Sequence, residues 1–226
     1  MFLAEDGRPA GLIWNYTRRE ILADGLVHLL GVALGLAGAI AIVILAALAP
    51  LAAVDQAAVV VYAAALVSML GVSATYNMWP VGRRKWLLRR ADHALIYLMI
   101  AGTYTPLVAL VGAGGTAWSL LAGVWLVAGL GIALKLTMPG RFDRAAIGLY
   151  LLLGWSGLAA YDSVIAQLQP DALWLLAAGG LLYSFGVVFH VWRSLPYQNA
   201  IWHAFVLAAT ACHYGTVLTT VLNAGA

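Results

Sequence analysis

The chain has 226 residues, of which 64% are hydrophobic and only 9% are charged, and its mean hydropathy is +0.92. This composition excludes a soluble single domain, because so much apolar surface needs lipid as its solvent. The formal charge is +3, but the basic residues fall in short clusters between apolar runs, which excludes a nucleic-acid-binding face. The single cysteine, Cys212, excludes a disulfide framework and a CxxC metal or redox motif.

Seven apolar runs are each close to the length of about 20 residues that a membrane-spanning helix needs. The connections between them are short, which leaves no room for a second folded domain. We therefore predict an all-α membrane protein, with a cytoplasmic N-terminal segment (1–24) and one seven-transmembrane helix bundle (25–226). The predicted spans are 25–48, 57–79, 93–112, 117–136, 145–162, 172–192 and 200–222.

The basic residues predict the orientation of this bundle, because positively charged short loops stay on the cytoplasmic side. With seven spans, all twelve Lys and Arg residues fall on the side of the N-terminus. The N-terminus is therefore expected in the cytoplasm and the C-terminus outside, in the inner (plasma) membrane. Asp143, Asp162 and Asp171 are interpreted as loop charges with no site implied.

Polar and ionisable residues inside lipid are costly, so each one is a candidate functional residue. At the start of the first span, Glu20, Asp24 and His28 recur at i, i+4 steps on one helical face. Acidic residues at a helix N-terminus also stabilise the helix dipole, so it stays open whether Glu20 and Asp24 belong to a site.

The predicted orientation brings the inner ends of spans one, two, three and seven to the same depth. His213 lies ten residues beyond His203, about 15 Å deeper, and is interpreted as a separate buried histidine. The residues expected to form or border a polar inner-leaflet cavity are Glu20, His28, Ser73, Tyr76, Asn77, Asp92, His93, Asn199, His203 and His213.

Four segments carry a resemblance to a known family, and together they cover nearly the whole chain. They are Glu20 to His28, Ser73 to Asn77, Leu88 to Pro106, and Ile201 to Leu207 with His213. The sequence resembles the haemolysin III family, the bacterial branch of the superfamily that includes the progestin and adiponectin receptors. The resemblance implies a Ser-xxx-His motif in the second span, a His-xxx-His motif in the seventh, and a zinc ion held by the three histidines.

This chain departs from that pattern at two of the three histidine positions, which hold Asn77 and Asn199, while His203 remains. Ser73 and Asp92, which the resemblance implies as supports of a metal-bound water, are both present. An asparagine oxygen is a weak zinc donor, so no tight metal site is expected, with Asp92 and His203 as weak candidates. Asparagine both donates and accepts hydrogen bonds, which favours a metal-free network of these five side chains.

Three functions follow as hypotheses. The preferred one is a non-enzymatic protein that senses or adjusts membrane lipid state, with membrane lipids or a fatty acid as its partner. The alternative is a zinc-dependent hydrolase of lipid amides or esters, although no GxSxG or Ser-His-Asp pattern is present and no catalytic residue is assigned. A channel, proton relay or cytolysin is the third, and the near absence of polar residues in the middle of spans four to six disfavours it.

Overall fold

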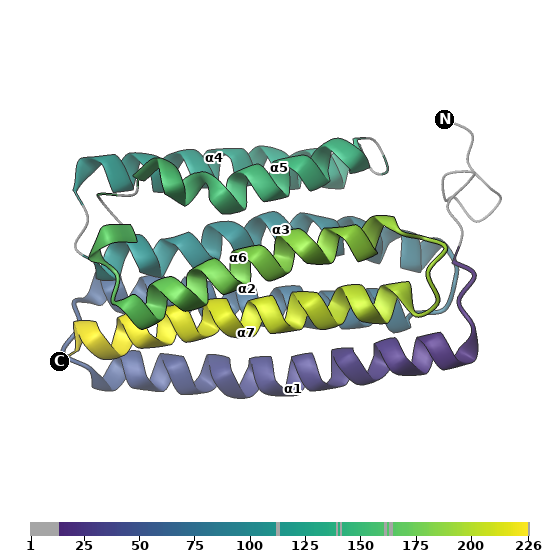
Figure 1. Cartoon of the computed structure of the whole chain (residues 1–226), viewed down its shortest axis with the longest axis horizontal. Coiled ribbons are helices and arrows are strands. Elements are labelled where there is room, and N and C mark those ends of the chain that lie inside the picture. Colours follow the sequence, from purple (N-terminus) through teal and green to yellow (C-terminus); the bar gives the residue numbers. More distant parts are fainter. Residues whose placement is uncertain are drawn as a thin grey trace.

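The computed structural model describes residues 14–111, 114–138, 140, 142–160, 162 and 165–225. These residues form seven α-helices and two short 3₁₀ helices, and successive α-helices run in opposite directions along the bundle (Figure 1). The elements are α1 (Arg18–Leu48), α2 (Ala53–Met78), α3 (Arg83–Leu110), α4 (Gly115–Thr137), α5 (Asp143–Trp155), η1 (Ser156–Ala160), η2 (Ile165–Gln167), α6 (Pro170–Val191) and α7 (Gln198–Ala224).

Six of these helices, all except α5, are long and apolar enough to cross a membrane. Their outer faces carry large exposed apolar side chains, among them Leu34 and Leu126, which are 64% and 67% exposed. Such faces require an apolar solvent. The chain is thus an all-helical, multi-span membrane protein, as the composition predicted.

Helix α5 departs from the prediction of a continuous span over 145–162. Its α-helix has 13 residues and ends at Trp155, and the chain continues as the 3₁₀ helix η1. The side chain of Tyr104 in α3 explains the change, because its hydroxyl accepts from the Gly157 amide at 2.7 Å and lies 2.9 Å from the Gly154 carbonyl. A rise of 1.5 Å per α residue and 2.0 Å per 3₁₀ residue makes the combined segment about 30 Å long.

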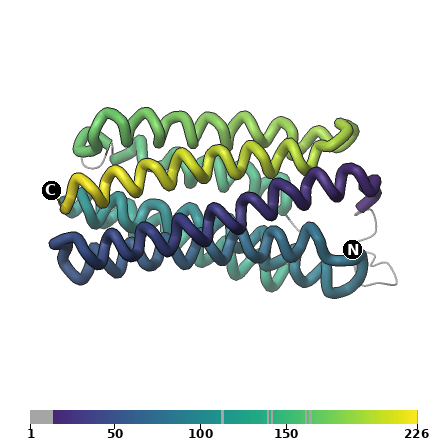
Figure 2. Tube along the Cα trace, turned by 90° about the horizontal axis from the view of Figure 1, so that it is seen from below, coloured from purple at the N-terminus to yellow at the C-terminus, as the bar shows by residue number. Residues whose placement is uncertain are grey.

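Two apolar cores hold the helices together. The larger joins α1, α2, α3, α6 and α7 around fully buried side chains such as Ile42, Tyr62 and Val217. The smaller joins α3 to α4 and α5 around Tyr97 and Val124. Figure 2 shows α1 lying along α2 and α7, which brings the beginnings of α1 and α7 and the end of α2 to one end of the bundle.

Two local interactions position the helix ends at this end of the bundle. Thr17 and Glu20 form a reciprocal capping box at the start of α1, and Glu20 Oε1 also accepts from the backbone amide of Tyr197, which precedes α7. The buried ammonium of Lys85 donates to the carbonyls of Tyr76, Asn77 and Trp79 and so satisfies the last turn of α2. These contacts tie α1 to α7 and α2 to α3.

Candidate functional site

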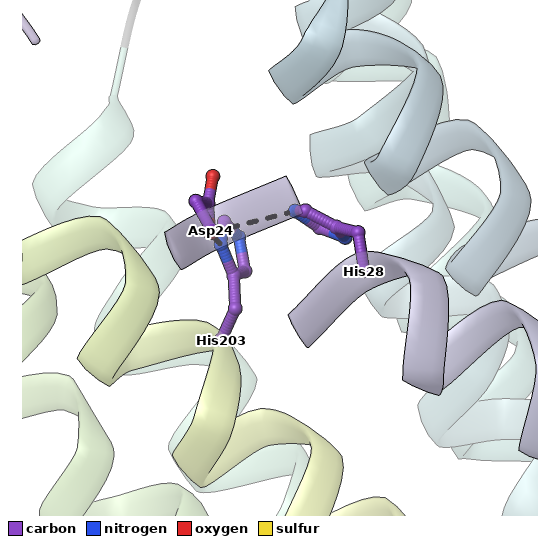
Figure 3. Close-up of side chains that lie close together, drawn as sticks. All are labelled: Asp24, His28 and His203. Carbon is purple, nitrogen blue, oxygen red and sulfur yellow. Dashed lines mark hydrogen bonds and ion pairs between the residues drawn. The ribbon is translucent and has the colours of Figure 1, made fainter. Parts of the chain in front are cut away.

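A buried carboxylate, Asp24, lies at the centre of the polar end of the bundle. It is 3% exposed and lies nearly two turns into α1. Its Oδ1 atom lies 2.6 Å from Nδ1 of His203 in α7 and 3.7 Å from Nε2 of His28, one turn further along α1. Figure 3 shows the carboxylate between the two imidazoles. The centroids of the two rings are 4.4 Å apart.

A chain of amides holds the other oxygen of this carboxylate. Asn199 Nδ2 donates to Asp24 Oδ2 at 2.7 Å and to Asn77 Oδ1 at 3.1 Å. Asn77 Nδ2 in turn donates to the Ser73 carbonyl at 2.9 Å. The Ser73 side chain also lies beside the carboxyl group of Asp92 in α3. Residues from α1, α2 and α7 are therefore linked in one hydrogen-bonded system, and Asp92 of α3 borders it.

The sequence builds this system from three pairs at i, i+4 spacing, which place both members on one face of a helix. The pairs are Asp24 and His28 in α1, Ser73 and Asn77 in α2, and Asn199 and His203 in α7. Because the three helices meet at the same end of the bundle, the three faces converge.

Within the described residues, the structure brings together His28, Ser73, Asn77, Asn199 and His203 of the predicted set, with Asp92 beside Ser73. The acid that binds His203 is Asp24, which the predicted set did not include. Asp92, the acid of the predicted five-residue network, lies beside Ser73. The i, i+4 spacing between Asp24 and His28 is the feature of the sequence that could have identified Asp24 as a site residue.

Glu20, Tyr76, His93 and His213 lie outside this hydrogen-bonded system. Glu20 caps α1 and binds the Tyr197 amide, while the Tyr76 hydroxyl accepts from the indole of Trp14. His213 lies deeper, beside the ring of Tyr183 in α6.

His93 belongs to a second charged group between α3, α4 and α5. The Asp143 carboxylate accepts from Arg89 at 2.9 Å and from Lys135 at 2.7 Å, and His93 Nδ1 lies 4.0 Å from it. The interpretation of Asp143 as a loop charge was therefore wrong, because it is the first residue of α5 and pairs with charged groups of two other helices. The sequence pattern carried no signal for this pairing, because the four residues are on three different helices.

A cavity of about 1030 Å³ opens between α3, α5, α6 and α7. It adjoins both polar clusters, the hydrogen-bonded residues around Asp24 (the Asp24 system) and the charged residues around Asp143 (the Asp143 group). Its walls are mainly apolar, and along α3 they run from Arg89 to Leu107, a length of about 27 Å at 1.5 Å per residue. Asp92 and His203 line it and connect it to the Asp24 system. Three arginines, Arg89, Arg144 and Arg193, lie at the end of the bundle where α1, α3, α5 and α7 begin.

The three-histidine zinc site that the resemblance implies does not fit this geometry. Asn77 and Asn199 bond to each other, and Asn199 also bonds to Asp24, so both amides are already engaged. A different set of donors does converge within the described residues. Asp24, His28 and His203 each offer one ligand atom, and these three atoms lie within 4.8 Å of one another.

Comparisons with known proteins agree on one family. The family model described as "Haemolysin-III related" matches residues 16–214. A "Hemolysin-3 homolog" of Bacillus subtilis is 32% identical over 203 residues, which cover 90% of this chain and 95% of that protein.

Two further relatives match over shorter stretches. "Hemolysin-3" of Bacillus cereus is 42% identical over 131 residues, covering 58% of this chain and 60% of that protein. The human "Monocyte to macrophage differentiation factor" is 31% identical over 162 residues, covering 68% and 66%. No solved structure gives a significant match.

Proposed function

The chain belongs to the haemolysin-III-related family of multi-span membrane proteins, and we propose that it senses or adjusts the lipid state of the membrane by binding an acidic amphiphile. The ligand is a fatty acid or a lipid with an anionic head. The role is non-enzymatic, and occupancy of the cavity shifts the packing of the helices around it.

The long cavity between α3, α5, α6 and α7 is the observation that carries this proposal. Its volume of about 1030 Å³ is at the upper end of the range of 300–1,000 Å³ typical of small-molecule sites. Its length of about 27 Å along α3 approaches the thickness of the hydrocarbon core, about 30 Å. An acyl chain of one leaflet therefore has room to lie in it.

The charges at one end of this cavity favour an anionic head. Arg89 and Lys135 together bind the single carboxylate of Asp143, which leaves one positive charge uncompensated within that trio. Arg144 and Arg193 line the same end and are exposed. Guanidinium groups bind carboxylate and phosphate in a forked geometry, which suits the head of such a ligand.

The proposed orientation places this end at the cytoplasmic leaflet of the plasma membrane. The described basic residues in the connections gather there, at the beginnings of α1, α3, α5 and α7 (Figure 1). Helix α5 with η1 then completes a seventh crossing, because its combined length of about 30 Å matches the hydrocarbon core.

Binding of a fluorescent long-chain fatty acid to detergent-purified protein tests the proposal. The variant Ala177→Phe places a ring in the cavity wall, and we expect it to lose most of the binding. Leu181→Phe adds a similar ring on the same helix at a side chain that is 62% exposed, and it should bind as the wild type does. Equal binding by both variants would refute a ligand in this cavity.

The charge of the head is tested separately. Arg144→Gln with Arg193→Gln should weaken binding of the fatty acid but leave binding of the matching fatty alcohol unchanged. In cells, loss of the gene should alter fatty-acid composition or growth under cold stress. Unchanged lipid composition together with unchanged growth would contradict the sensing role.

A further inference from the structure

We propose that Asp24, His28 and His203 form a binding site for a divalent transition metal of the zinc class. The site has one carboxylate and two imidazoles, and it shares only His203 with the three-histidine set that the resemblance implies. It lies beside the lipid cavity and does not depend on what the cavity binds.

The distances among the three donors suit a single ion. Zinc bonds of about 2.0–2.2 Å in tetrahedral geometry place two ligand atoms about 3.4 Å apart. Asp24 Oδ1 and His28 Nε2, at 3.7 Å, are already close to that separation. Asp24 Oδ1 and His203 Nδ1, at 2.6 Å, share a hydrogen bond that must lengthen. Metal binding then replaces this hydrogen bond with two metal bonds. The proton between the two atoms moves to Nε2 of the same ring if His203 is neutral, and to solvent if the ring is an imidazolium.

His28 provides an independent observation that points to a ligand. The residue is 7% exposed, and its Nε2 atom is buried without a hydrogen-bond partner among the described residues. Buried polar atoms in folded proteins are almost always paired. This nitrogen faces Asp24 Oδ1 from 3.7 Å, too far for a hydrogen bond but suitable for a shared ion.

The two asparagines then act as supports. Asn199 fixes Oδ2 of Asp24, and Asn77 fixes the side chain of Asn199, so Oδ1 is held toward both histidines. Metal-ligating carboxylates are commonly oriented by such second partners. Asn77 and Asn199 occupy two of the histidine positions that the resemblance implies. In their place, α1 supplies two other donors, the carboxylate of Asp24 and the imidazole of His28.

Titration of chelator-treated protein in detergent with Co²⁺ and Zn²⁺ tests this site. We expect one Co²⁺ per chain with visible ligand-field absorption that Zn²⁺ abolishes, and an increase of the unfolding temperature on metal addition. Asp24→Asn, His28→Ala and His203→Ala should each abolish stoichiometric binding. Asn199→Ala should lower the affinity by about 10- to 100-fold, the usual effect of losing an orienting partner.

His213→Gln serves as the control, because it removes another buried histidine whose Nε2 lacks a partner among the described residues. It should bind Co²⁺ as the wild type does. Asp92→Asn distinguishes the proposed donors from a donor set that includes Asp92 and His203. Loss of binding in Asp92→Asn with retention in His28→Ala would overturn the proposed donor set.

If a variant fails to fold, X-ray absorption of the zinc-loaded wild type identifies the atoms that bind the metal. A first shell with two imidazoles and a carboxylate oxygen supports the site. Absence of stoichiometric binding by the wild type, or a first shell without imidazole, would overturn it.

Discussion

At the scale of single residues, Asp24 organises the polar end of the bundle. Its two oxygens face different partners, with the imidazoles on Oδ1 and the Asn199 amide on Oδ2. A buried carboxylate in an apolar surrounding persists only when such partners satisfy it. The neighbouring amides are therefore part of the stability of the helix ends as well as of the site.

Asn199→Ala tests this role in stability. It removes the hydrogen bonds to Asp24 and Asn77, and interhelical hydrogen bonds in membrane proteins contribute about 0.6–2 kcal/mol. We expect the free energy of unfolding to fall by about that amount, measured by thermal unfolding in detergent.

Asn223→Ala in the last turn of α7 is the control, because its side chain is exposed. It should unfold at the temperature of the wild type. If both variants unfold at the temperature of the wild type, the hydrogen bonds of Asn199 do not stabilise the bundle.

At the scale of elements, small residues decide how closely the helices approach. A Cβ at Gly131 in α4 would lie 2.5 Å from the ring of Tyr97 in α3, whereas one at Gly129 meets nothing within 4 Å. Glycine at position 131 thus permits the close packing of α4 on α3 that holds the smaller core together.

Gly131→Ala should destabilise the protein by about 1–3 kcal/mol, the usual cost of overpacking. Gly129→Ala, two positions away on the same helix, should be neutral or slightly stabilising, since alanine has the higher helix propensity. Thermal unfolding of the two variants measures the difference. Equal stability would mean that Tyr97 moves aside without cost.

A second prediction at this scale concerns the end of α2. Lys85 is 6% exposed and satisfies three terminal carbonyls, so Lys85→Met should cost about 1–3 kcal/mol, as for other buried groups left unpaired. Arg84→Met removes an exposed neighbouring charge and should change little. If the two variants unfold alike, the cap contributes nothing.

At the scale of the whole molecule, the bundle is polar at one end and apolar along its length. The Asp24 system, the Asp143 group and the arginines of the cavity all lie at the end where α1, α3, α5 and α7 begin. The opposite end carries few charges. The proposed orientation depends on this unequal distribution of charge between the two ends of the bundle.

Single cysteines in a Cys212→Ser background test that orientation. Ser194→Cys, between α6 and α7, should react with a membrane-impermeant maleimide only after lysis. Ala52→Cys, between α1 and α2, should react in intact cells. Both side chains are exposed, so reaction at Ser194→Cys in intact cells would reverse the orientation.

The sequence by itself determined the number of helices and which of their ends carry the polar residues. Hydrophobic runs and i, i+4 spacing are properties of the local chain, so both could be predicted. The short-range pairs within α1, α2 and α7 follow from the same spacing.

Only the tertiary structure decided which acid faces His203, how Asp143 is paired, and where α5 ends. Spacing along a helix defines its faces, but the rotation of each helix about its own axis depends on packing against its neighbours. That rotation turns Asp24 toward His203 and places Asp92 beside Ser73. Likewise, α5 ends at Trp155 because Tyr104, about 50 residues earlier in the chain, offers its hydroxyl to the backbone there.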